Sequence, residues 1–126
     1  MASVQRNRQA NKRVFVPRTK ERLQFIQQHT VGSDKLMVYE FVSKDCEVCK
    51  AMRRPFMDLS GKFHDKAGFF KLDVDRFQDL ATNYGVEAYP TFVLVKLENG
   101  EKVVDKVVGV KEVTLENSIQ RAIDEN

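Results

Sequence analysis

The stretch LMVYEFVSKDCEVCKAMRRP, from Leu36 to Pro55, decides the fold of this chain. Its first seven residues form an apolar run that is typical of a buried strand. After the polar residues 43–45, apolar side chains recur at steps of three and four residues, which predicts a helix with one buried face. The members of that face are Val48, Met52, Phe56, Leu59 and Phe63. Two cysteines therefore lie where a strand passes into a helix.

These cysteines, Cys46 and Cys49, are the only two in the chain, and their position predicts redox chemistry rather than a structural disulfide. Unpaired backbone N–H groups and the helix dipole at the first turn favour a thiolate on Cys46. Cys49 follows three residues later on nearly the same helical face, close enough to close a small disulfide ring. We expect Cys46 to be the exposed nucleophile and Cys49 the resolving thiol beneath it.

A metal site is the main alternative for the cysteine pair. Tetrahedral zinc needs four ligands, and the only histidines, His29 and His64, have no metal-ligand spacing to the cysteines. A zinc or iron–sulfur site would therefore need ligands from a second chain. Two inert cysteines are the remaining alternative. The redox interpretation requires no metal and no organic cofactor.

Composition indicates one domain with one core, because the chain has 126 residues of which 42% are hydrophobic. No apolar run approaches the length of a membrane span, and residues 1–13 hold no hydrophobic segment of a secretory signal. Two retained thiols then favour a reducing compartment, and we expect the cytoplasm.

The basic excess of the chain belongs to its first residues. Of the formal net charge of +3, residues 1–13 contribute +4, which leaves −1 for residues 14–126. We expect residues 1–13 to be a disordered basic tail before a domain at 14–126. A nucleic-acid arm and an organelle transit signal are the alternatives for the tail. We expect neither nucleic acid nor membrane as a partner of the domain.

Periodicity along the chain predicts the order βαβαβαββα, with helices on both faces of a mixed central sheet. Pro55 predicts a kink in the second helix, Asp75 and Gln78 predict a capping box for the third, and Asn99-Gly100 predicts a hairpin. The expected strands are 14–16, 36–42, 69–74, 91–95 and 103–108. The expected helices run over 19–28, from the cysteines to about Phe63, from Asp75 to Tyr84, and from about Thr114 onward.

Residues 14–126 resemble thioredoxin, and most closely the cytosolic h type of plants. The resemblance is carried by Glu40-Phe41, Cys46-x-x-Cys49-Lys50, Lys71-Leu72-Asp73-Val74-Asp75, Tyr84-Gly85-Val86, Tyr89-Pro90-Thr91 and Val104-Asp105-Lys106-Val107-Val108-Gly109. Pro90 lies 41 positions after Cys49, the separation that the family uses for its cis-proline. The resemblance implies a thioredoxin-like α/β fold. It also implies reduction of protein disulfides by the Cys46/Cys49 pair, which a thioredoxin reductase or glutathione would regenerate.

The resemblance also implies roles for Glu40 and Lys71. The family places a buried aspartate at the position of Glu40, so Glu40 would accept the proton of Cys49, with Lys71 as its partner. The residues alone leave two alternatives open. Glu40 could lie on a solvated face of its strand, and Lys71 could be an ordinary surface lysine.

A substrate groove is implied beside the cysteines, with Pro90 in the cis form. Its other expected members are Tyr89, which is similar to a tyrosine of protein disulfide isomerase domains, and Asp45, Glu47 and Val48. The site departs from the family's Trp-Cys-Gly-Pro-Cys, because Asp45 and Glu47 put two carboxylates beside Cys46 and oppose thiolate formation. The alternative function is therefore a thioredoxin-like binding or redox-sensing module with a weak site. The sequence makes no prediction of oligomeric state.

Overall fold

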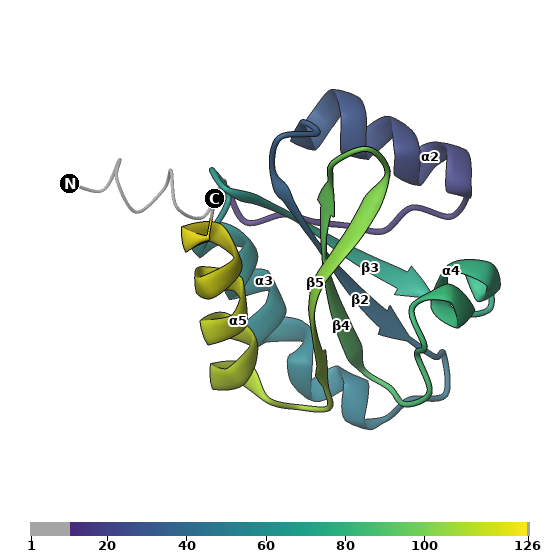
Figure 1. Cartoon of the computed structure of the whole chain (residues 1–126). Coiled ribbons are helices and arrows are strands. Elements are labelled where there is room, and N and C mark those ends of the chain that lie inside the picture. The colour runs from purple at the N-terminus through teal and green to yellow at the C-terminus, as the bar shows by residue number, and fades with distance from the viewer. Residues whose placement is uncertain (1–10, 126) are drawn as a thin grey trace.

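Five strands form one sheet in the computed structural model, which describes residues 11–125 (Figure 1). The strands lie in the order β1-β3-β2-β4-β5. The first three are parallel, whereas β4 is antiparallel to β2 and β5 is antiparallel to β4. The predicted mixed sheet of a thioredoxin-like fold is confirmed. The bounds are β1 Val14–Phe15, β2 Leu36–Val42, β3 Ala67–Asp73, β4 Thr91–Leu97 and β5 Glu101–Val108.

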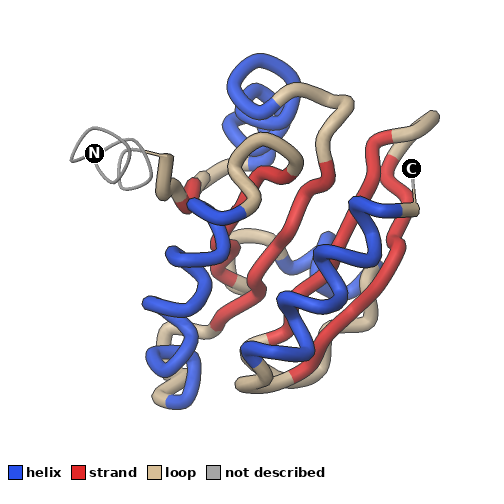
Figure 2. Tube along the Cα trace, turned by 90° about the vertical axis from the view of Figure 1, so that its left-hand side faces the viewer, coloured by secondary structure: helices blue, strands red, loops and turns tan. Residues whose placement is uncertain are grey.

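Helices cover both faces of the sheet, as predicted. On one face α3 (Arg53–Lys62) and α5 (Glu112–Asp124) lie side by side, which Figure 2 shows in front of the sheet. On the other face lie α2 (Lys20–Phe25), its π-helical continuation η1 (Ile26–Val31), and α4 (Gln78–Asn83). Among the described residues, no helix is both long enough and apolar enough to cross a bilayer.

Side-chain alternation along β2 divides the core between the two faces. Leu36 and Val38 pack with residues of α3 and α5, while Met37, Tyr39 and Phe41 pack on the side of α2 and α4. All five are buried. The alternation places the even-numbered residues of β2 under α3.

The helix after the cysteines differs from its prediction. It begins as the 3-10 helix η2 (Val48–Met52) and becomes α-helical only at Arg53. Pro55 has no N–H to donate to the carbonyl of Ala51, and the irregularity expected from it lies at this 3-10 to α boundary. The expected burial of Val48 is wrong, since its side chain is 58% exposed. A 3-10 turn has about three residues, so a step of four no longer returns to the same face.

The predicted capping box of α4 is also wrong. Gln78 is the first residue of the helix, and Phe77, at the N-cap, makes no side-chain capping bond. A capping box needs the glutamine two positions further into the helix. Instead, the Asp73 carboxylate accepts a hydrogen bond from the backbone N–H of Asp75 at 2.9 Å.

The hairpin and the N-terminal end follow their local chemistry. Asn99 and Gly100 have positive φ angles of 54° and 103°, which Asn and Gly tolerate best, and they join β4 to β5 as predicted.

Lys12 forms an ion pair with Asp58 at 2.8 Å, so this part of the expected tail contacts α3. The prediction for residues 1–10 lies outside the described residues.

Candidate active site

The cysteine pair follows the carboxyl end of β2, and the two residues differ in exposure. Cys46 and Cys49 form a disulfide with a Cα–Cα separation of 5.4 Å. Cys49 is buried, at 7% exposed, whereas Cys46 is partly exposed. The backbone N–H of Cys49 donates to the sulfur of Cys46 at 3.2 Å. In the reduced protein the same donor favours a thiolate on Cys46.

The segment before β4 lies beside the end of β2. Thr91 stands opposite Phe41 in the antiparallel register, which places Pro90 next to the loop that carries the cysteines. The Tyr89–Pro90 peptide bond is cis, the form that the resemblance implies. The Pro90 carbonyl accepts a hydrogen bond from the backbone N–H of Gly109 at 2.8 Å. Three loops therefore meet at one end of the sheet.

Glu40 is buried in the sheet, and only 2% of its side chain is exposed. It stands on β2 opposite Lys71 of β3 and Phe92 of β4, on the face that α3 covers. Of the two alternatives for Glu40, the solvated face is therefore wrong. Its carboxylate oxygen Oε2 has no hydrogen-bond partner among the described residues. Lys71 is half-buried.

The environment of Glu40 changes its proton affinity. Burial raises the pKa of the Glu40 carboxyl to about 7, although the charges of Lys71 and Arg53 act in the opposite direction. Arg53 was not expected to act on this carboxyl. Its signal in the sequence is its place four residues after Cys49, one helical turn along. The carboxyl can therefore both accept and release a proton near neutral pH.

The charges beside Cys46 are surface charges, and one of them is paired. Asp45 and Glu47 are both exposed. The ammonium of Lys50 lies 2.8 Å from a carboxylate oxygen of Glu47, in an ion pair whose side chains are 57% and 81% exposed. Lys50 therefore offsets part of the negative charge that the sequence places next to Cys46.

Exposed apolar side chains surround the site. Tyr89 is 36% exposed and Val48 is 58% exposed, so both predicted groove residues are accessible. The sequence analysis missed Val108 and Val110, which flank Gly109 and are 45% and 48% exposed. Their signal is an apolar pair that continues past the last strand without a core position to fill. Among residues 11–125, no three His, Cys, Asp or Glu side chains gather as a metal site.

Comparison with known proteins agrees with this geometry. The family model for thioredoxin matches residues 15–121. The chain is 46% identical to "Thioredoxin H4" of Arabidopsis thaliana over 87 residues, which cover 69% of this chain and 71% of that protein. It is 41% identical to "Thioredoxin-1" of Schizosaccharomyces pombe over 90 residues, which cover 71% and 84% of the two chains.

A solved structure shows the same fold. The crystal structure of the thioredoxin NaTrxh from Nicotiana alata superposes with a TM-score of 0.74 at 36% identity, over 87% of this chain and 92% of that one. Family, fold and cysteine pair agree, and the chain is a thiol–disulfide oxidoreductase that belongs to the thioredoxin family.

Proposed function

We propose that Cys46 is the attacking thiol, Cys49 the resolving thiol and Glu40 the proton acceptor of this oxidoreductase. The observation that carries the assignment is the unequal exposure of the cysteines, because only Cys46 is accessible to a substrate disulfide. The Cys49 N–H at the Cys46 sulfur supports it further, since a hydrogen-bond donor stabilises the thiolate that must attack.

The reaction proceeds in two exchanges. The Cys46 thiolate attacks one sulfur of the substrate disulfide, and the other substrate sulfur leaves as a thiolate and takes a proton. Cys49 then gives its proton to Glu40 and attacks the Cys46 sulfur, which releases the second substrate thiol. The protein ends with the Cys46–Cys49 disulfide, and the substrate has gained two electrons and two protons.

Glu40 suits its part in the second exchange because its pKa, raised by burial to about 7, lies near the working pH. Lys71 stands opposite Glu40 in the sheet and adjusts this pKa through its charge. The glutamate has one methylene more than the family's aspartate, so its carboxyl reaches further from β2 toward the helix above it.

Substrate binds across the exposed apolar side chains at the same end of the sheet. Tyr89 forms one side of this surface, next to the buried cis Pro90, and Val48 forms the other, with Asp45 and Glu47 at its rim. An extended segment with apolar side chains next to its cysteine fits this surface. The two carboxylates favour substrates with basic residues beside the disulfide.

Thioredoxin family proteins act on disulfide-containing proteins and are reduced by thioredoxin reductase. We infer the same electron donor here, with glutathione as the alternative, and a place in cytoplasmic redox homeostasis. A coupled assay that follows NADPH oxidation with a plant thioredoxin reductase, and separately with glutathione reductase and glutathione, tests the donor. A fluorescent fusion of the full chain tests the compartment.

Reduction of insulin disulfides by dithiothreitol tests the reductase function. The wild-type protein should accelerate insulin precipitation, and Cys46→Ser should return the rate to that of dithiothreitol alone. A wild-type rate equal to that of dithiothreitol alone would leave the binding or redox-sensing module as the function.

Trapping tests the two roles of the cysteines. Cys49→Ser should accumulate mixed disulfides with protein substrates, because only the resolving exchange is lost. Cys46→Ser serves as the matched control and should trap none. Trapping by Cys46→Ser but not by Cys49→Ser would reverse the assignment.

A further inference from the structure

A basic groove lies along β1, away from the cysteine loop. It is a hollow of about 530 Å³ between β1, the segment 16–19 that follows it, and the outer side of α2 and η1. Arg13, Arg18 and Arg22 line it, and no carboxylate of residues 11–125 does. A smaller hollow of about 110 Å³ adjoins it, shares Arg13, and adds Lys35 and His64, whose ring lies 2.8 Å from the Asp65 carboxylate.

The charge of this basic groove is not neutralised by the described part of the chain. None of its three arginines forms an ion pair with a residue of 11–125. Residues 1–10 contain no Asp or Glu, so they offer no counter-charge either. The hollow between α2 and α4 differs, because three carboxylates, Asp75, Asp79 and Glu101, line it together with Lys20 and Arg76. Like charges around one hollow repel one another, and an anionic occupant removes that cost.

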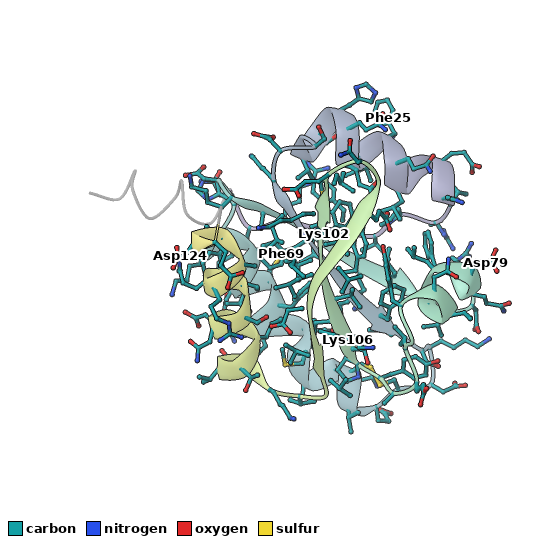
Figure 3. All side chains as sticks on the ribbon, in the orientation of Figure 1. Phe25, Phe69, Asp79, Lys102, Lys106 and Asp124 are labelled. Carbon is teal, nitrogen blue, oxygen red and sulfur yellow. A yellow bond between two sulfur atoms is a disulfide. The ribbon has the colours of Figure 1, made fainter. Side chains whose placement is uncertain are left out.

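Two of the arginines are held by aromatic rings. The Arg13 guanidinium lies 4.6 Å from the centroid of Phe15, and that of Arg22 lies 5.2 Å from the centroid of Phe25. Figure 3 shows Phe25 pointing outward from α2, away from the body of the domain. Stacking against a ring leaves the N–H edge of a guanidinium free to donate to carboxylate oxygens.

The floor of the basic groove is apolar and ends at the edge of the sheet. Val16 is 63% exposed, and Val14 and Phe15 are half-buried. Among the described strands, β1 is outermost and pairs only with β3, so its other side can accept a further strand. β1 has two residues and Pro17 follows the exposed Val16, which limits such pairing to a short extended segment.

We propose that the basic groove binds an extended acidic segment of a partner protein. A strand edge above an aliphatic floor suits a polypeptide, whose backbone pairs with the edge and whose carboxylates reach the three arginines. Single-stranded nucleic acid binds instead on exposed aromatic platforms, and here Phe15 is half-buried beneath Arg13. The groove lies at the β1 edge of the sheet, whereas the cysteines follow β2 in its middle, so the two sites are distinct.

Fluorescence anisotropy with a labelled decapeptide of alternating Glu and Val tests the proposal. The wild-type protein should bind it at 50 mM NaCl and lose most of the binding at 0.5 M, since exposed charges are screened. Arg18→Glu together with Arg22→Glu should weaken binding about tenfold. Arg18→Glu alone should also weaken binding. Lys20→Glu is its matched control and should weaken binding less, because Lys20 lies between the two arginines in the chain but lines the other hollow.

The proposal is overturned by no binding of the peptide, by equal weakening by Lys20→Glu and Arg18→Glu, or by tighter binding of a ten-nucleotide single strand than of the peptide. NMR titration of the wild-type protein gives a reading that does not depend on how the variants fold. Amide shifts should be confined to residues 13–22 and their neighbours. Shifts centred on residues 45–49 would place the peptide in the redox site instead.

Discussion

At the scale of single residues, the buried carboxyl of Glu40 costs stability. Glu40 has one carboxylate oxygen without a hydrogen-bond partner among the described residues, and a charge there is poorly solvated. Lys71 and Arg53 reduce this cost through their charges and do not remove it, because the pKa stays raised at about 7. If Glu40 accepts the proton of Cys49 as proposed, function and stability oppose each other at this position.

Glu40→Gln should therefore stabilise the protein at pH 8 and do so less at acidic pH. The carboxyl titrates near 4.5 in the unfolded chain and near 7 in the folded one, so the folded state holds its proton longer. The free energy of unfolding of the wild type then falls as pH rises from 4.5 to 7, by about 3 kcal/mol. Urea denaturation of both proteins across pH 4–8 measures the difference, with the exposed Glu98→Gln as control. A difference that does not depend on pH would contradict the buried, protonated carboxyl.

The carboxylates of Asp45 and Glu47 beside Cys46 should lower the reduction potential of the disulfide, which makes the protein a stronger reductant. They raise the free energy of the thiolate-bearing reduced state. Glu47→Gln should raise the potential, and Lys50→Gln, which removes its ion-pair partner, should lower it. Both side chains are exposed and screened, so we expect shifts of roughly 20 mV or less. Redox titration against glutathione measures both, and shifts of the same sign would show that the pair does not act through its charge.

At the scale of elements, helix ends and helix docking depend on side chains from elsewhere in the chain. Hydrogen bonds connect α5 to β5: Asp105 of β5 accepts one from the hydroxyl of Ser118 and one from the guanidinium of Arg121, both in α5. Ser118 is 1% exposed, whereas the Asp105 side chain is 38% exposed, so this bond runs from the core to the partly exposed edge of the helix–sheet contact. It fixes the docking of a helix whose other inward residues are apolar and specify no orientation.

Ser118→Ala should lower the free energy of unfolding by about 1–2 kcal/mol, because the Asp105 carboxylate loses a buried donor. The neighbouring exposed Asn117→Ala, on the same helix, is the matched control and should change it by less than about 0.5 kcal/mol. Urea denaturation at pH 7 measures both. An unchanged stability in Ser118→Ala would mean that α5 is held by apolar packing alone.

At the scale of the whole molecule, one tyrosine on β2 joins η1 to β5, which lie far apart in the sequence. The hydroxyl of Tyr39 accepts a hydrogen bond from the side-chain amide of Gln27 in η1 and donates one to Glu101 of β5. Glu101 also accepts a hydrogen bond from Tyr84, which follows α4. Burial holds the pKa of Tyr39 well above its ordinary value, so the hydroxyl stays protonated. The network therefore joins η1, β2, β5 and the end of α4, which are distant in sequence. Hydrogen bonds are directional, so they fix the relative positions of these elements more closely than apolar packing does.

Tyr39→Phe should destabilise the protein by about 1–3 kcal/mol, because the buried Gln27 amide loses its partner. Tyr84→Phe removes an exposed hydrogen bond to the Glu101 carboxylate, so it should lower the free energy of unfolding by less than Tyr39→Phe does. Thermal unfolding followed by circular dichroism compares the two at equal pH and salt. A larger loss of stability in Tyr84→Phe than in Tyr39→Phe would show that the exposed Tyr84–Glu101 hydrogen bond contributes more than the buried Gln27–Tyr39 bond.

The sequence by itself determined the order of strands and helices, the strand-to-helix position of Cys46 and Cys49, and the hairpin at Asn99-Gly100. These features rest on local periodicity and turn chemistry, which each segment carries within itself. The separation of Pro90 from Cys49 is also given by the sequence, although the cis form of Pro90 was expected only from the family resemblance.

Tertiary structure decided which side chains each segment buries. η1 is the clearest case: the backbone N–H of Gly32 bonds to the carbonyl of Gln27, and the wider π-turn brings Gln27, Ile26 and Val31 to the interior together. An α-helical period would have separated them. Val48 was exposed in the same way by a 3-10 turn, and Glu40 was buried because α3 covers its face of the sheet. Local pattern fixes the period of a segment, but its burial depends on what the rest of the chain packs over it.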